Sequence, residues 1–196
     1  MAKLIFFCGH AGTGKSTLSR AALPLLHART GENFCLLDKD TLYVDYSASV
    51  MKMLTGDPHD RDSPTFLEHL RPLEYAGTLA TMRENLEIGV NAVLCSPFSQ
   101  EIKSKQLFNT AFLQVPADTD IHVVWVTVDE ALAKSRIISR NNPRDKYKLE
   151  HWEEYRVRRF EPTPTDFPEL IMIDNTRGVT AVLPGLIDEL TGTVSL

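Results

Sequence analysis

Short apolar runs alternate along the chain with longer segments in which apolar residues recur at helical spacing. Several of the runs are continuously apolar, which is typical of strands buried on both faces of a parallel sheet. After the first run, Lys15–Arg29 has the pattern of an amphipathic helix, and Gly31 ends it. This alternation indicates an α/β fold with right-handed crossovers. The expected strands are Lys3–Cys8, Asn33–Leu37, Asn91–Cys95, Asp120–Val128 and Leu170–Ile173.

Two connections between these strands are longer than a simple crossover requires. One is Asp129–Pro168, between the fourth and fifth strands. The other separates the second and third strands, and a structureless loop of that length is rare. We therefore expect an insertion at about residues 41–89, with helices around Tyr43–Leu54 and Leu73–Leu86. Pro72 suits the first turn of the second helix. Insertions of this kind often carry substrate-binding surface.

Length and composition predict one globular domain over residues 1–196, with 43% hydrophobic and 24% charged residues. No apolar run reaches the roughly 18 residues of a membrane span, and the first run is too short for a signal-peptide core. The three cysteines show no CxxC spacing, which favours buried thiols in a reducing compartment. We expect a cytoplasmic monomer or homodimer with no membrane partner.

Charge is unevenly distributed along the chain. The net charge of −5 argues against a nucleic-acid partner, because phosphate backbones require a basic face. The segment Lys134–Arg159 is nevertheless basic, with nine Lys and Arg against four Asp and Glu. This segment is either a local anion site or a solvated basic helix face.

The segment between the first strand and the first helix fits the phosphate-loop pattern G-x-x-x-x-G-K-[ST]. Its glycines let successive backbone N–H groups face a phosphate, and the following helix directs its positive end at the anion. In this pattern Lys15 reaches the β- and γ-phosphates and Ser16 reaches magnesium. The segment therefore predicts binding of ATP with Mg²⁺. The residues expected at the nucleotide are Gly9, His10, Ala11, Gly12, Thr13, Gly14, Lys15, Ser16 and Thr17.

Two carboxylates follow the second strand, at Asp38 and Asp40. Ligands of a parallel sheet bind at the carboxyl ends of its strands, so both side chains can point at one site. One of them suits a magnesium-bound water, and the other suits a general base for a hydroxyl group. The alternative for Asp40 is that it only caps the following helix.

An arginine pair follows the fourth strand. Arg136 and Arg140 are four residues apart and share a helix face, and Arg144 comes soon after them. Planar guanidinium groups suit both stacking on a base and forked binding of phosphate. The alternative is again a solvated helix face.

At these residues the chain resembles the small P-loop kinases of metabolites, the group of shikimate, gluconate and nucleoside monophosphate kinases. Asp38-Lys39-Asp40 is similar to the Asp-x-Asp of shikimate and gluconate kinases. Arg136–Arg140 is similar to the segment with which adenylate kinases enter their mobile lid. The strand Leu170–Asp174 and the residues up to Arg177 resemble the last strand and adenine-side loop of the group.

The resemblance implies a three-layer fold with a five-stranded parallel sheet in the order 2-3-1-4-5 and helices on both faces. It implies a lid at about residues 139–149, with Arg136 and Arg177 on the adenine side and Arg140 and Arg144 near the phosphates. Asp38 would join Ser16 at magnesium. The catalytic residues would be Lys15, Asp40 as base, and Arg140.

The leading functional hypothesis is a kinase that transfers the γ-phosphoryl group of ATP to a hydroxyl of a small molecule. Its acceptor would lie between Asp40, Ser96 and the insertion, where Arg61 and Arg71 either bind an anionic acceptor or are solvated. The third strand ends without an acidic residue, which argues against motor ATPases. Two alternatives remain. One is a polynucleotide 5′-hydroxyl kinase or a zeta-toxin-like kinase of a sugar nucleotide. The other is an NTPase or switch without an acceptor.

Overall fold

A five-stranded parallel sheet forms the centre of the protein in the computed structural model, which describes residues 1–192. Its strands lie in the order β2-β3-β1-β4-β5, and all neighbouring strands run parallel. The expected topology is therefore confirmed. The last residues of the expected domain, 193–196, lie outside the described residues. The strands are β1 (Lys3–Cys8), β2 (Phe34–Asp38), β3 (Asn91–Cys95), β4 (Asp120–Thr127) and β5 (Leu170–Asp174).

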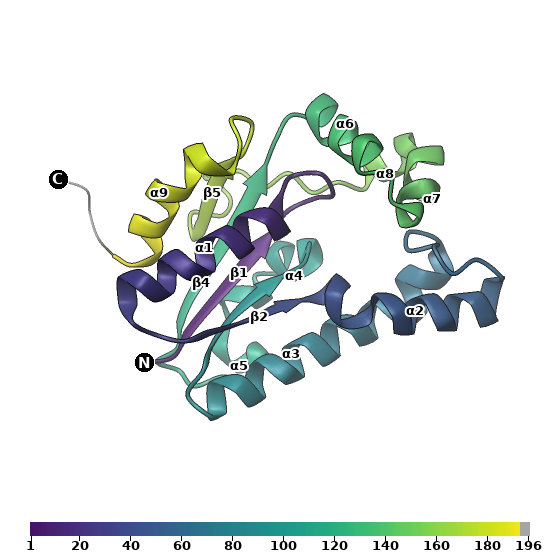
Figure 1. Cartoon of the computed structure of the whole chain (residues 1–196). Coiled ribbons are helices and arrows are strands. Elements are labelled where there is room, and N and C mark those ends of the chain that lie inside the picture. Colours follow the sequence, from purple (N-terminus) through teal and green to yellow (C-terminus); the bar gives the residue numbers. More distant parts are fainter. Residues whose placement is uncertain (193–196) are drawn as a thin grey trace.

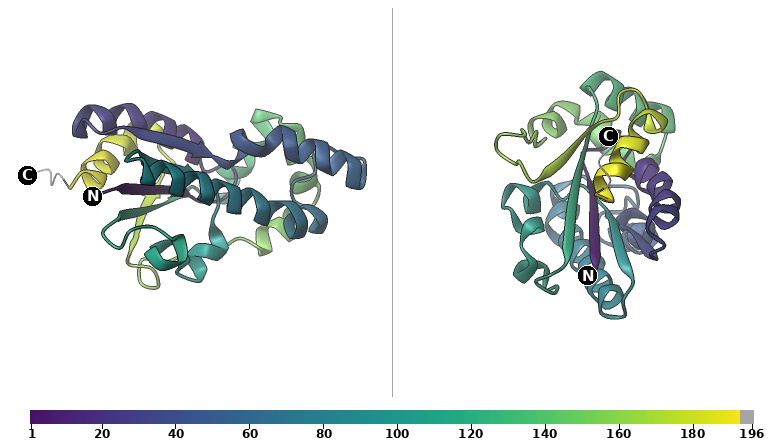
Figure 2. Two further views of the ribbon diagram at one scale, coloured as in Figure 1. Left: turned by 90° about the horizontal axis from the view of Figure 1, so that it is seen from below. Right: turned by 90° about the vertical axis from the view of Figure 1, so that its left-hand side faces the viewer.

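Helices cover both faces of the sheet and give three layers (Figures 1 and 2). One face packs against α1 (Lys15–Thr30) and α9 (Val179–Leu190). The other packs against α3 (Arg71–Glu87) and the short helices α4 (Ser99–Lys103) and α5 (Thr110–Leu113). The turn η2 (Gln106–Phe108) joins the two short helices.

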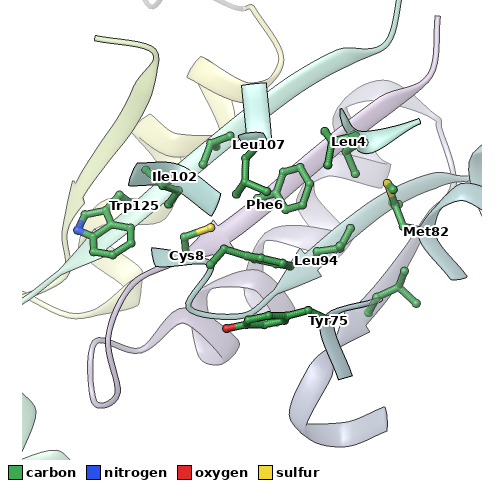
Figure 3. Packing of buried hydrophobic residues seen from close by; sticks show 14 of the residues in the cluster. Leu4, Phe6, Cys8, Tyr75, Met82, Leu94, Ile102, Leu107 and Trp125 are labelled. Carbon is green, nitrogen blue, oxygen red and sulfur yellow. The ribbon is translucent and has the colours of Figure 1, made fainter. Parts of the chain in front are cut away.

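The central strand β1 supplies both halves of the core. Leu4, Phe6 and Cys8 face the layer of α3, α4 and α5, where Figure 3 shows them among Tyr75, Met82 and Leu107. Ile5 and Phe7 face the layer of α1 and α9. Because successive side chains of a strand point to opposite faces, a strand covered on both sides is apolar at every position.

The insertion after β2 consists of α2 (Lys39–Thr55) and a π-helical turn η1 (Phe66–Leu70) that leads into α3. It extends beyond the carboxyl end of the sheet in Figure 1. Helix α2 begins earlier than the pattern around Tyr43 predicted, because the Asp38 carboxylate accepts a hydrogen bond from the Asp40 backbone N–H at 3.1 Å. Asp38 is thus the N-cap of α2, and the interpretation of Asp40 as the cap is wrong.

The connection between β4 and β5 holds α6 (Glu130–Arg140), a 3₁₀ turn η3 (Pro143–Asp145), α7 (Lys146–Glu150) and α8 (Trp152–Val157). It faces the insertion across the carboxyl end of the sheet (Figure 1). The three cysteines carry free thiols, and Cys8 and Cys95 are buried as expected. Within residues 1–192, no helix has the length and apolar character needed to cross a membrane.

Candidate active site

The phosphate-loop segment leaves β1 in a backbone conformation that requires glycine. Gly9 has φ 131° and Gly12 has φ 82°, both in the region that L side chains avoid. A Cβ at Gly9 would lie 2.4 Å from the Val126 carbonyl oxygen, and one at Gly12 would lie 2.4 Å from the Ala133 carbonyl oxygen. The loop is therefore fixed by its contacts with β4 and α6 as well as by its own turns.

Helix α1 begins directly after this loop and has no side-chain cap at Gly14. Its first N–H groups are thus available to an anion, and the helix dipole favours negative charge there. Lys15 lies at this end, where its ammonium group donates to the His10 carbonyl oxygen at 3.2 Å. Burial lowers the pKa of Lys15, while Cys95, Asp40 and Asp38 oppose that shift. This arrangement matches the binding of a triphosphate.

A cavity of about 620 Å³ opens in front of Lys15 and Ser16. Its size lies within the range of about 300–1,000 Å³ that is usual for small-molecule sites. Asp38, Asp40, Arg140 and Arg144 line the same cavity, so the structure brings together candidates from three distant segments. Ten Lys and Arg side chains line it, against four Asp side chains. The ten are Lys15, Lys39, Arg61, Arg71, Lys103, Arg140, Arg144, Lys148, Arg158 and Arg159.

Asp40 lines this cavity among several cations. Its carboxylate pairs with Lys39 at 3.1 Å, with Arg144 at 3.1 Å and with Arg61 at 3.5 Å. Burial alone would raise the pKa of Asp40, but these positive charges outweigh it and hold the pKa well below its usual range. Asp40 is therefore ionised throughout the physiological pH range and takes up a proton only weakly.

A buried carboxylate fixes the cations on either side of Asp40. Glu74 is 2% exposed and accepts hydrogen bonds from Lys39, Ser47 and Arg61. Arg61 binds both Glu74 oxygens, at 2.7 and 2.9 Å. Because charged groups of this kind are costly to bury unpaired, Glu74 holds Lys39 and Arg61 against Asp40.

The segment expected to form a lid is tied to the insertion by ion pairs. Lys148 of α7 lies 3.0 Å from the Asp62 carboxylate, and Arg144 reaches Asp40 of α2. Arg140 forms a bidentate pair with the buried carboxylate of Asp145. Arg140, Arg144 and Lys148 thus pair with acids on other elements, whereas Lys146, Arg156 and Arg158 of the same basic segment are exposed.

Arg136, expected on the adenine side, is linked to the phosphate loop through Asn175. Arg136 donates to the Asn175 carbonyl oxygen at 3.1 Å, and the Asn175 amide donates to the Thr13 carbonyl oxygen at 2.8 Å. These bonds join α6 and the loop after β5 to the phosphate loop. Arg177 is exposed and does not line the cavity.

Comparison with known proteins gives the same fold and adds a family. The sequence profile of a family described as "AAA domain" matches residues 4–162, which is most of the chain. The chain belongs to this family. No curated protein matches it.

Solved structures similar to this AAA-domain chain include Kti12 and two kinases. Kti12 of Chaetomium thermophilum, solved with ADP-AlF3, has a TM-score of 0.65 and 20% identity over 98% of this chain and 100% of its own. A gluconokinase from Sinorhizobium meliloti has a TM-score of 0.55 and 15% identity, over 97% of this chain and 92% of its own. A sugar kinase from Janibacter has a TM-score of 0.57 and 13% identity, over 100% of this chain and 99% of its own. At these identities the likeness shows the fold alone, and that fold confirms the expected resemblance to P-loop kinases.

Ser96 was expected at the acceptor, but Cys95 and Tyr155 of the cavity carried little signal in the sequence. The Ser96 hydroxyl is buried and has no hydrogen-bond partner among residues 1–192. The Cys95 thiol lies 3.3 Å from the Ser16 hydroxyl, and burial raises the pKa of Cys95, so it stays neutral there. The Tyr155 hydroxyl accepts a hydrogen bond from the Ala11 N–H of the phosphate loop. A conspicuous motif marks none of them.

Proposed function

We propose that this chain is an ATP-dependent kinase that transfers the γ-phosphoryl group to a hydroxyl of a small-molecule acceptor. The observation that supports it is the single cavity that joins the phosphate loop at Lys15 to Asp40 and Ser96. A bare NTPase needs only the phosphate side of such a cavity. The space beyond Asp40, lined by the insertion, suits a second substrate.

The residues fit a nucleotide-bound Mg²⁺. Ser16 and Asp38 line the cavity together with Lys15. Within residues 1–192 there is no group of three or more His, Cys, Asp or Glu that could hold a metal alone. That donor set suits magnesium, which in nucleotide sites takes one or two protein ligands together with phosphates. A magnesium ion held by these two residues would supply positive charge to the triphosphate.

Asp40 is assigned to orienting the acceptor. Its ionised oxygens accept the hydrogen bond of the acceptor hydroxyl, whose oxygen attacks the γ-phosphorus while the bond to the β-phosphate oxygen breaks and ADP leaves. The hydroxyl proton passes to Asp40 late, because the low pKa of Asp40 makes it a weak base. A loose transition state requires little of a base, so this weakness is tolerable. Lys15 and Arg140 stabilise the charge on the transferred group.

The proposal is tested by following ADP release with a panel of hydroxyl compounds, each compared with ATP and Mg²⁺ alone. An acceptor kinase releases ADP faster with its acceptor and yields a phosphorylated product that mass spectrometry detects. Equal ADP release with and without every acceptor would support an NTPase. Oligonucleotides and sugar nucleotides belong in the panel. Phosphoryl transfer to an oligonucleotide would support the polynucleotide kinase, and transfer to a sugar nucleotide would support the zeta-toxin-like kinase.

A further inference from the structure

The cations of the cavity are not equally neutralised. Lys39, Arg61, Arg140, Arg144, Lys148 and Arg159 each pair with a carboxylate. Lys15 is reserved for the triphosphate under the proposed function. Arg71, Lys103 and Arg158 also line the cavity, and none of the three forms an ion pair with a residue of 1–192. Arg158 follows α8 and bonds the Glu154 carbonyl oxygen, whereas Arg71 and Lys103 belong to α3 and α4, next to the insertion.

Arg71 packs against the ring of Tyr75, which in turn stacks on the ring of Phe98. Its guanidinium donates to the Tyr75 hydroxyl at 3.1 Å and lies 5.4 Å from the centroid of that ring. Tyr75 stacks on Phe98 with ring centroids 4.8 Å apart. Phe98 is fully buried and has φ 46°, a conformation that a bulky residue adopts only when its surroundings impose it. Arg71 is therefore positioned by the core and is not a freely solvated side chain.

The nearby carboxylates do not neutralise the positive charge of Arg71. Burial opposes the charged form of Arg71, but its pKa is raised because Tyr75, Glu101 and Asp62 favour that form. Asp62 is already paired with Lys148, and Glu101 does not line the cavity. An unpaired guanidinium fixed at a cavity wall is a binding group for a planar or tetrahedral oxyanion.

Two unpartnered polar atoms border the same space. The Ser96 side chain is 2% exposed, and its hydroxyl has no partner among residues 1–192. Arg61 bonds Glu74 through Nη2, whereas its buried Nη1 has no acceptor within the described part of the chain. Both residues line the cavity. Buried polar atoms of a native site normally find a partner, so these two point to a ligand.

We propose that the phosphoryl acceptor itself carries an oxyanion, a phosphate or a carboxylate, which binds to Arg71 and Lys103 while Asp40 orients its hydroxyl. This inference rests on the proposed kinase function for the role of the bound molecule, but the anion site itself is independent of turnover. Arg71 and Lys103 both lack a counter-charge on this side of the cavity, which favours a dianionic phosphate ester over a carboxylate.

The anion site is tested by calorimetric titration with inorganic phosphate, and separately with acetate, after a non-hydrolysable ATP analogue and Mg²⁺ have filled the phosphate loop. We expect phosphate to bind to this complex. Arg71→Met and Lys103→Met should each weaken it about 10- to 100-fold, the value of a charge-assisted hydrogen bond. Lys105→Met is the matched control, because Lys105 lies two residues away and outside the cavity. Acetate should bind more weakly than phosphate.

Thermal unfolding of each variant shows whether it has folded, and Arg71→Lys provides a second variant that keeps the charge. If the nucleotide analogue abolishes phosphate binding, the phosphate had bound at the phosphate loop, and the inference is overturned. Equal binding by folded Arg71→Met and wild type would overturn it as well.

Acceptor class is tested with matched compounds, each offered as the neutral alcohol, the carboxylate and the phosphate monoester. Selective turnover of an anionic member, with a raised KM in Arg71→Met, supports the inference. Turnover of neutral members that Arg71→Met leaves unchanged overturns it while the kinase function stands. If no compound raises ADP release but phosphate still binds at Arg71, the proposed kinase function fails and the anion site remains.

Discussion

Replacing Asp40 with Asn tests the central assignment of the proposed kinase. Asn keeps the shape of the side chain but carries no charge and accepts no proton. A positioned base contributes about 10²- to 10⁴-fold to a rate. Lys39, Arg61 and Arg144 all stabilise the ionised form, so Asp40 is a weak base. We therefore expect transfer to fall by about 10²-fold, at the lower end of that range.

Asp38→Asn is the matched comparison, because Asp38 and Asp40 line the same cavity two residues apart. Asp38 caps α2, and Asn caps a helix about as well as Asp does, so the fold should persist. Asp38→Asn should raise the Mg²⁺ concentration needed for half-maximal activity. Asp40→Asn should leave that concentration and the nucleotide affinity nearly unchanged.

The assay measures transfer to the identified acceptor as a function of Mg²⁺, with nucleotide affinity determined separately by calorimetry. Retained transfer in Asp40→Asn would refute the role of Asp40. A similar loss of nucleotide affinity in both variants would also contradict the argument, because it would place both carboxylates at the metal rather than at two different substrates.

Three further predictions concern the rest of the site. Lys15→Ala should lower turnover by roughly 10²-fold or more, because charge on the transferred group loses its partner; near-normal turnover by the folded variant would contradict this. Burial lowers the pKa of His10 from 6.5 to about 4. The unfolded chain therefore binds a proton first as the pH falls, and stability should drop by about 3 kcal/mol between those pH values. Chemical denaturation of His10→Gln should show a flatter pH dependence than that of the exposed-site control His59→Gln. Lys148→Met should speed amide hydrogen exchange over residues 139–149 by removing the tie to Asp62, whereas Lys146→Met, at an exposed position, should not.

The fold could be predicted because its signals are local. A continuously apolar run marks a strand covered on both faces, and β1 is buried at nearly every position. The phosphate loop shows its glycines and lysine in one short motif. The ends of the strands were harder to predict. Strand β2 extends to Asp38 because that residue pairs with Cys95 of β3. The sequence of β2 alone does not show which residues its neighbour strand offers.

The acceptor side of the site could not be predicted in the same way. Arg61 is flanked by two aspartates and Arg71 by Leu70 and Pro72, but neither setting decides which of the two arginines binds an anion. Only the folded chain shows that Glu74 neutralises Arg61 through two hydrogen bonds, while Arg71 rests on Tyr75 and has no carboxylate partner among residues 1–192. Contacts between distant segments decide which cation is available.

The same reasoning changes what the net charge of the chain means. A total of −5 argued against a nucleic-acid partner on the scale of the whole molecule. Binding depends on the local potential, however, and a cavity with low-dielectric walls strengthens it. Here α2, α3, α4 and the lid bring their cations to one cavity, where ten meet four carboxylates. An acidic surface and a cationic cavity together favour small anions, which enter the cavity, over long polyanions, which must also approach the surface.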